Sequence, residues 1–169
     1  MTEKEFIAKI QKHSGIIHKI LYLYVDDPED SRDLKQEIQL QAWKAKERFR
    51  GDSQFSTWLY RVALNTVLTF KRKKQVQTSE ILDSDFAKEH PKESTEQSDL
   101  LLRAIKSLND IDKTIITLHL DDYDNGEIAD ITGLSKNNVG VKLHRIKDHL
   151  KKKINDRPNG WIKRSMGFH

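Results

Sequence analysis

Five polar side chains in the last third of this 169-residue chain are of the types that recognise nucleic acids. Lysine and arginine donate hydrogen bonds to phosphates and guanine, and an asparagine amide can form two hydrogen bonds with adenine. They are interleaved with Val139, Leu143 and Ile146, which recur at helical spacing, so the polar side chains fall on the opposite side of a helix. The candidates for contacts with bases or phosphates are Lys136, Asn137, Asn138, Lys142 and Arg145.

The charge around this expected helix is one-sided. Between residues 135 and 153, seven lysines or arginines stand against a single acid, Asp148. The alternative is an ordinary amphipathic helical hairpin with a solvated charged face, but such faces usually mix charges of both signs. Clustered positive charge is typical of surfaces that bind phosphates. The segment therefore favours nucleic-acid binding.

Two short helices about a turn are expected to hold these side chains in place. Asp124 and Glu127 have the spacing of a capping box, which begins a first helix. Gly133 supplies the left-handed residue that ends this helix, and Ser135 is the expected N-cap of the next one. This is the sequence form of a helix-turn-helix, whose second helix enters the major groove of DNA.

The carboxylates of Asp121, Asp122 and Asp124 offer a different chemistry, since a metal-dependent nuclease could use them to bind cations. Read as a calcium loop, the segment has Tyr123 at its third position and Thr132 at its twelfth, so two ligands are missing. The seven histidines are scattered, and the lack of cysteine removes thiol catalysis, disulfides and cysteine-ligated zinc. We expect no catalytic residue, no metal site and no cofactor.

The composition favours small helical units over one large core. Hydrophobic residues make up 36% of the chain and charged residues 33%, with a net charge of +4. No apolar run approaches the length of a membrane span, and the first residues lack the hydrophobic core of a signal peptide. We therefore expect a cytoplasmic protein that does not insert into membranes.

Residues 1–75 are predicted to form a three-helix domain. Apolar residues recur at helical spacing over residues 6–24, which predicts one amphipathic helix. Asp27-Pro28 suits the start of a second helix, whose apolar side continues to Phe49. A third helix is expected to begin at about Ser56, its N-cap, and to end in the basic run at residues 71–74.

The rest of the chain divides into a linker, a second domain and a tail. Residues 76–98 hold six acids, two lysines and no sustained apolar period, which predicts a flexible acidic linker. Helical spacing returns over residues 101–118, and with the helix-turn-helix this predicts a four-helix domain at residues 99–154. Residues 155–169 form a basic tail. The expected fold class is all-α, with two small helical domains joined by the linker.

A second candidate binding segment covers residues 49–74, where aromatic and basic side chains are interleaved around Gly51. Exposed aromatic rings can stack on unpaired bases while basic side chains hold the nucleic-acid backbone. Alternatively the large apolar side chains of this segment belong to the core, which helical spacing favours for Leu59, Val62 and Phe70. Four rings could serve either purpose, and at least one should be buried: Phe49, Phe55, Trp58 and Tyr60.

Asn65 is a polar amide midway along an expected apolar helix. Burial of an amide is costly unless the group forms hydrogen bonds, here with a base edge or a neighbouring backbone group. Asn65 is therefore a further candidate for contact with a base.

Three motifs, taken in order, resemble one known family. They are D-L-K-Q-E-I-Q-L-Q-A-W at residues 33–43, F-R-G-D-S-Q-F-S-T-W-L-Y-R-V-A-L-N at 49–65 and E-I-A-D-I-T-G-L-S-K-N-N-V-G-V-K-L-H-R at 127–145. In residue types, order and separation, they resemble the bacterial extracytoplasmic-function sigma factors, the smallest specificity subunits of RNA polymerase. The resemblance covers nearly the whole chain outside the linker and tail, and it implies two helical domains called region 2 and region 4.

The resemblance also implies a role for individual residues. Region 2 would bind the clamp helices of core RNA polymerase through Asp33, Gln36 and Glu37. Region 4 would read the duplex −35 promoter element with the five polar residues of the helix-turn-helix. An anti-sigma factor is a further implied partner, and polymerase would supply all the catalysis. Capture of a flipped base of the single-stranded −10 element would fall to Gly51, Asp52, Ser53, Phe55, Ser56, Trp58, Arg61 and Asn65.

The chain departs from the family pattern at a few positions. Gly140 stands where a basic residue is common, which implies weaker or shifted −35 contacts and costs about 1 kcal/mol of helix propensity. Asn109 stands where a proline is frequent. A conventional helix-turn-helix regulator that binds duplex DNA without polymerase is the rival hypothesis, and it would not need the motif at residues 33–43.

Overall fold

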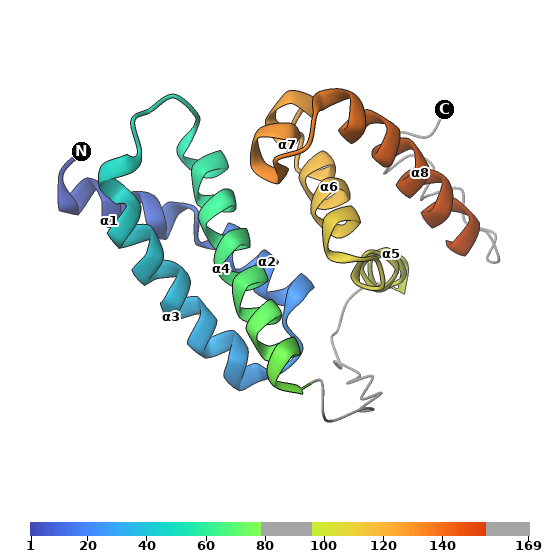
Figure 1. Cartoon of the computed structure of the whole chain (residues 1–169), viewed down its shortest axis with the longest axis horizontal. Coiled ribbons are helices and arrows are strands. Elements are labelled where there is room, and N and C mark those ends of the chain that lie inside the picture. The colour runs from blue at the N-terminus through green and yellow to red at the C-terminus, as the bar shows by residue number, and fades with distance from the viewer. Residues whose placement is uncertain (79–95, 155–169) are drawn as a thin grey trace. The chain divides into compact units, whose positions relative to one another are not determined.

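The structure, a computed structural model, describes residues 1–78 and 96–154, and its regular elements there are all helices (Figure 1). The chain separates into two compact units, Met1–His90 and Pro91–His169. The predicted all-α class with two helical domains is confirmed. Most of the expected linker and the whole expected tail lie outside the described residues. In the described part of the chain, no helix is long and apolar enough to cross a membrane.

Within residues 1–78, the first unit contains four α-helices and one short 3-10 helix. The single helix predicted over residues 6–24 is divided at His13, where φ is −103° and ψ is 19°. The division lets Phe6 and Ile17, on the two successive helices, both be buried in the unit. The elements are α1 (Glu3–Lys12), α2 (Ser14–Tyr24), α3 (Pro28–Ala45), η1 (Lys46–Arg48) and α4 (Phe55–Thr78).

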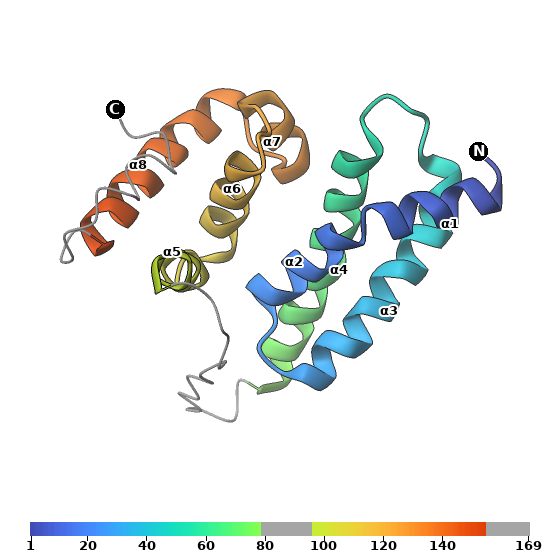
Figure 2. The ribbon, with the colours of Figure 1, turned by 180° about the vertical axis from the view of Figure 1, so that it is seen from behind.

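The long helices α3 and α4 lie side by side, and α1 and α2 run across one side of the pair (Figure 2). Each helix contributes an apolar stripe at three- and four-residue spacing, so its polar side stays in solvent. Asp27 accepts a hydrogen bond from the Glu29 amide at 3.1 Å with Pro28 in the first turn, as predicted for the start of α3. The core residues include Ile20, Leu23, Leu34, Ile38, Ala42, Leu59, Ala63 and Val67.

Helix α4 differs from its prediction at both ends. It begins at Phe55, and the Trp58 amide donates to the Gln54 carbonyl at 3.1 Å, so Ser56 lies in the first turn and is not the N-cap. The side chain of Phe55 is packed inside, which draws this residue into the helix. At the other end the helix continues past the basic run to Thr78, and Lys74 forms an ion pair with Asp30 of α3.

The second unit contains the four predicted helices. Its core is built from all of them and includes Ile105, Ile115, Leu118, Ile128, Val139 and Leu150. Asn109, the residue found in place of a proline, caps its helix by accepting a hydrogen bond from the Asp112 amide at 2.9 Å. The helices are α5 (Glu96–Lys106), α6 (Asp110–Leu120), α7 (Asn125–Thr132) and α8 (Lys136–Ile154).

Helices α7 and α8 form the predicted helix-turn-helix. Asp124 Oδ1 accepts from the Glu127 amide at 2.8 Å, and this backbone hydrogen bond lowers the pKa of the Asp124 carboxyl. Gly133 has a left-handed backbone (φ 78°), and Ser135 Oγ accepts from the Asn138 amide at 3.1 Å. The caps and the turn residue are therefore confirmed, and together they fix where α8 begins.

Two glycine substitutions in this unit should change stability in opposite directions. Gly133→Ala should lower the free energy of unfolding by about 1 kcal/mol, because a Cβ disfavours positive φ. Gly140→Ala should raise it by up to about 1 kcal/mol, because Gly140 lies inside α8 and a Cβ there would meet only Asn125 Nδ2, at an ordinary 3.6 Å. Urea unfolding of the full chain, followed by circular dichroism, measures both; equal shifts of the same sign would contradict this account.

Candidate nucleic-acid and protein interfaces

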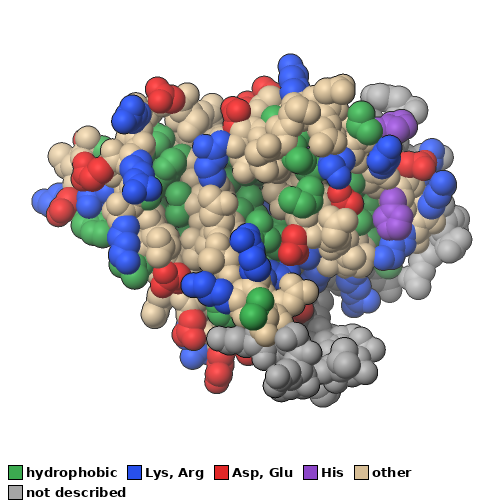
Figure 3. All heavy atoms as spheres, in the orientation of Figure 1, with side chains coloured by type: hydrophobic (Ala, Val, Ile, Leu, Met, Phe, Trp, Pro, Cys, Tyr) green, Lys and Arg blue, Asp and Glu red, His purple; other side chains and the backbone are tan. Residues whose placement is uncertain are grey.

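One side of α8 presents the polar residues singled out in the sequence. Lys136, Asn137, Asn138 and Arg145 are exposed and Lys142 is half-buried, whereas Val139, Leu143 and Ile146 are buried. We call the exposed side of α8 the reading face. On the side of the molecule drawn in Figure 3, Lys, Arg and His side chains gather over α8.

The reading face contains a hollow that sequence analysis only partly identified. It combines three of the predicted residues with four that were not predicted as site residues: Asn125, Gly140, Val141 and His144. Val141 donates no side-chain hydrogen bond, although its four-residue spacing from Asn137 and Arg145 is a usable signal in the sequence. Asn125 is at the start of α7, and only the fold brings it to α8. The residues lining the hollow are Asn125, Lys136, Asn137, Gly140, Val141, His144 and Arg145.

The predicted −10 candidates lie along the loop at residues 49–54 and the first half of α4. Gly51, Asp52 and Ser53 are exposed in the loop, and Gly51 has a positive φ of 80°. Arg61 and Asn65 are exposed on α4, one helical turn apart, while Ser56 and Trp58 are half-buried. The premise that Asn65 is an amide in an apolar surrounding is wrong, because its side chain is exposed to solvent.

Aromatic rings pack together beneath this loop. The Phe55 ring, 7% exposed, has its centroid 5.9 Å from that of Phe6, 5.6 Å from Phe49 and 5.4 Å from Trp58. Of the four rings left open above, Phe55 and Tyr60 are buried, and Phe49 and Trp58 are half-buried. Phe55 therefore supports the loop from inside, and only Phe49 and Trp58 keep surface that a base could stack on.

Helix α1 contributes to this cluster, which sequence analysis did not anticipate. Lys9 Nζ lies 5.6 Å from the Phe55 centroid, and the His13 ring packs against Phe55 at 5.5 Å. Burial lowers the pKa of His13, and the neighbouring charges of Lys12 and Lys9 lower it further. No local pattern marks these contacts, because they join residues about forty positions apart and depend on the bend between α1 and α2.

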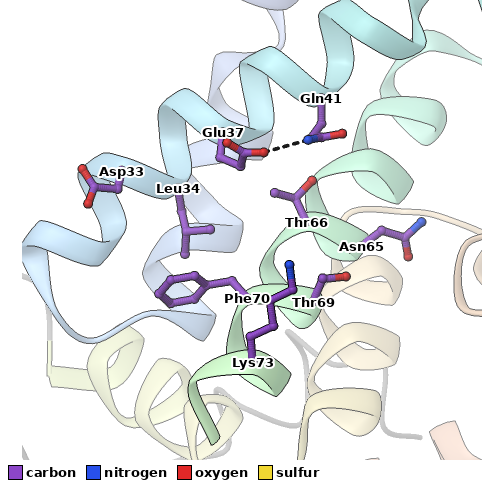
Figure 4. A pocket seen from close by; sticks show the side chains of 9 residues that line it. All are labelled: Asp33, Leu34, Glu37, Gln41, Asn65, Thr66, Thr69, Phe70 and Lys73. Carbon is purple, nitrogen blue, oxygen red and sulfur yellow. Dashed lines mark hydrogen bonds between the residues drawn. The ribbon is translucent and has the colours of Figure 1, made fainter. Parts of the chain in front are cut away.

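A groove between α3 and α4 brings residues of two predicted sites together (Figure 4). Asp33 and Glu37 come from α3 and Asn65 from α4, and Leu34 faces Phe70 in the view of Figure 4. The Gln41 side chain donates to Glu37 Oε1 at 2.7 Å. The full lining is Asp33, Leu34, Glu37, Gln41, Asn65, Thr66, Thr69, Phe70 and Lys73.

Asp33, Gln36 and Glu37 are all exposed on α3, off the buried stripe of Leu34 and Ile38. Leu40 was not predicted, yet it is 45% exposed and follows Gln36 and Glu37 by one turn. We call the exposed side of α3 that carries Asp33, Gln36, Glu37 and Leu40 the docking face. It combines an exposed apolar residue with polar neighbours, as protein interfaces commonly do.

The acidic turn before α7 takes part in capping rather than in a cluster of ligands. Asp121 is the C-cap residue of α6, and Asp124 caps α7. Among residues 1–78 and 96–154, no group of three or more His, Asp or Glu side chains is arranged to hold a metal ion.

The second unit is a helix-turn-helix unit with a basic reading face, and the first is a helical unit with a loop packed over aromatic rings. Together they define a two-domain DNA-binding protein. Residues 10–76 match the family model Sigma-70 region 2, and residues 98–150 match Sigma-70, region 4. The chain belongs to the extracytoplasmic-function sigma factors of RNA polymerase.

Relatives of full length support this assignment. RNA polymerase sigma factor SigV of Bacillus subtilis is 27% identical over 146 residues, which cover 85% of this chain and 87% of that protein. The ECF RNA polymerase sigma-E factor of Escherichia coli is 27% identical over 168 residues, covering 90% and 87% of the two chains. The solved structure of the sigma factor RpoE in complex with the anti-sigma factor NepR from Bartonella quintana shares the fold, with a TM-score of 0.77, 18% identity and coverage of 91% and 99%.

The packing of His13 predicts a pH-dependent loss of stability in the first unit. The folded-state pKa of His13 lies below its unfolded value of 6.5, so the unfolded chain binds the proton more tightly. The contribution of neutral His13 to stability is therefore present above the unfolded pKa and is lost as the pH falls through 6.5 toward the lower, folded-state pKa. His13→Gln should reduce this loss.

The measurement is urea unfolding read by the fluorescence of Trp43 and Trp58 in a Trp161→Phe background. The matched variant is His119→Gln in the second unit, where burial first, and then Lys147, lowers the pKa of His119. It should leave the response of the first unit unchanged. An identical pH dependence for His13→Gln and the parent would show that the His13 proton is not linked to folding of this unit.

Proposed function

We propose that this sigma factor binds core RNA polymerase through the docking face, reads the −35 element with α8 and captures a flipped base of the −10 element at residues 49–65. The observation that carries the proposal is that the polar members of all three sets lie on helices or loops whose apolar sides are buried, with the Phe55 ring among the buried groups. The family supplies the partners, core polymerase and promoter DNA. The structure supplies surfaces for each of them.

The reading face suits the major groove of the −35 element. Its central residues are Asn137 and Arg145, which can hydrogen-bond to adenine and guanine edges. Lys136, at the start of the helix, and Lys142, half-buried at its flank, are placed for phosphates on either side. Asn138 donates its backbone N–H to Ser135 Oγ and lies at the edge of the face, where its side chain can reach the backbone of the DNA.

The loop at residues 49–54 suits capture of an unpaired base. Gly51, Asp52 and Ser53 expose backbone and short polar side chains, and the half-exposed ring of Trp58 offers a surface for stacking. Extruding a base costs a few kcal/mol, and one aromatic stack returns about 1 to 3 kcal/mol. Together with a few polar contacts, that is enough to stabilise an opened strand.

Exposed polar residues continue from the loop along α4. Arg61 and Asn65 follow Trp58 on one side of the helix, so an unpaired strand leaving the loop would meet them in turn. Ser56 is half-buried in the first turn of α4, beside the loop. The buried Phe55 ring supports the loop by packing against Phe49. In this proposal Phe55 orders the capture site without touching the base.

The docking face suits the clamp helices of core polymerase. Leu40 provides apolar contact area at one end of the face, while Asp33, Gln36 and Glu37 supply hydrogen bonds and negative charge on the preceding turns. RpoE of Bartonella quintana is seen with the anti-sigma factor NepR, and we extend such a partner to this chain. An inhibitor that covered the docking face would exclude polymerase.

The rival hypothesis, a helix-turn-helix regulator acting without polymerase, is addressed by the experiment that tests the proposal. Purified core polymerase should initiate at discrete promoters of a genomic fragment library only when the chain is added. Glu37→Lys should reduce this activity and the retention of the chain on core polymerase at least tenfold, because it reverses charge within the docking face. Glu3→Lys, at an exposed acid on α1, is the matched control and should behave like the parent chain. Tight, specific promoter binding by the chain alone, with no effect of Glu37→Lys, would favour the rival.

Asn65→Ala should slow promoter opening while leaving binding of the closed duplex nearly intact, because Asn65 would meet DNA only after the strands separate. A loss of one hydrogen bond to a base, about 1 kcal/mol, predicts a several-fold decrease. Permanganate reactivity of the melted thymines measures the open complex. Thr69→Ala, one turn further along the same groove, is the control. Equal reactivity for Asn65→Ala and the control would remove Asn65 from the capture site.

A further inference from the structure

Val141 is an exposed apolar residue at the middle of the reading face. It is 44% exposed, while the residues on the opposite side of α8, Val139, Leu143 and Ile146, are buried. With about 100° of rotation per residue, Asn137, Val141 and, two turns beyond Val141, Asp148 point most directly away from that buried stripe. Lys142 is rotated by about 100° from Val141 and lies at the flank. The part of α8 that would reach deepest into a groove is therefore not its most basic part.

The position before Val141, Gly140, carries no side chain. The nearest group to a Cβ placed there would be Asn125 Nδ2, at 3.6 Å. Val141, Gly140 and Asn125 line the hollow on the reading face, together with Asn137, His144 and the two cations Lys136 and Arg145. The hollow thus has an apolar side formed by Val141 and a rim of hydrogen-bonding and positively charged side chains.

The edges of base pairs offer one apolar group to such a surface, the C5 methyl of thymine in the major groove. The rim matches the rest of the groove, since cations attract phosphates and Asn137 can bind a neighbouring adenine. Among the ligands that a basic helix face can meet, duplex DNA with a thymine at this point fits both parts of the surface.

We propose that Val141, with the space left open at Gly140, receives the C5 methyl group of a thymine in the −35 element, and that this contact helps to set promoter specificity. The inference rests on the proposed function of α8. A sigma factor with a long side chain at position 140 would fill that space. This chain should instead prefer thymine over cytosine at the base pair that faces Val141, because cytosine lacks the methyl group and carries an amino group in the same groove.

The test removes the methyl group and changes nothing else. Holoenzyme assembled from the full chain and core polymerase is bound to a −35-dependent promoter in which each thymine of the −35 element is replaced, one at a time, by deoxyuridine. At the thymine facing Val141, the affinity of the holoenzyme for the promoter should fall about fourfold, which corresponds to the loss of about 0.8 kcal/mol for one buried methyl group. At thymines elsewhere in the element, the change should be small.

Variants assign the effect to Val141. Val141→Ser should remove the sensitivity to deoxyuridine, whereas Val141→Thr, which keeps one methyl group and the branched shape, should retain most of it. Ile111→Ser, at another exposed apolar residue of the same unit, is the control for the loss of surface hydrophobicity and should behave like the parent chain. Matching thermal unfolding of the three variants and the parent shows that the fold is kept.

Two outcomes would overturn the inference, and they are distinguishable from failure of the proposed function. If every deoxyuridine changes the affinity of the parent chain by less than about 1.5-fold, Val141 receives no methyl group. If Val141→Ser keeps the full sensitivity, another residue does. In both cases Arg145→Ala should still weaken binding to the −35 element. If Arg145→Ala also has no effect, the assignment of α8 to the −35 element itself fails.

Discussion

Burial of one apolar stripe per helix is the constraint on which every proposed binding surface of this protein depends. In α8 the stripe of Val139, Leu143, Ile146 and Leu150 is buried against the rest of its unit, and this fixes the rotation of the helix about its axis. Rotation by one residue would turn the reading face by about 100° and expose apolar surface, so the core specifies which side chains a ligand can meet. The same holds for α3, where Leu34 and Ile38 are buried and the docking face points away.

The first unit adds a second constraint, the aromatic packing under the loop at residues 49–54. Phe55 packs against Phe6 of α1 and against Phe49. Because Phe49 begins the loop and Phe55 follows it, the contact between their rings holds the two ends of the loop together. Gly51 can then take its left-handed conformation in a loop whose ends do not move apart. The loop is ordered by rings that a ligand need not touch. The residues that support the proposed site are therefore different from the exposed residues that would contact a base.

Features that depend on local signals could be predicted from the sequence. Asp124, Gly133 and Ser135 each act on backbone groups within three or four residues, so their types and spacing were sufficient to predict the helix-turn-helix. The break at His13 and the start of α4 at Phe55 were not predicted, because both depend on packing between distant segments. The hollow on the reading face was only partly predicted, because Asn125 reaches α8 only in the folded unit. A second reason is that Val141 is not a residue type that donates hydrogen bonds.

Helices α3 and α4 together line one groove. Glu37 stands on one side and Asn65 on the other, so a protein bound at the first and a nucleic acid bound at the second would be sensitive to the same interhelical spacing. Thermodynamic linkage is reciprocal. If binding of the polymerase at Glu37 and binding of the unpaired strand at Asn65 favour the same interhelical spacing, each binding event raises the affinity for the other by an equal factor. A subunit built in this way would hold its enzyme more firmly on a melted promoter than in free solution.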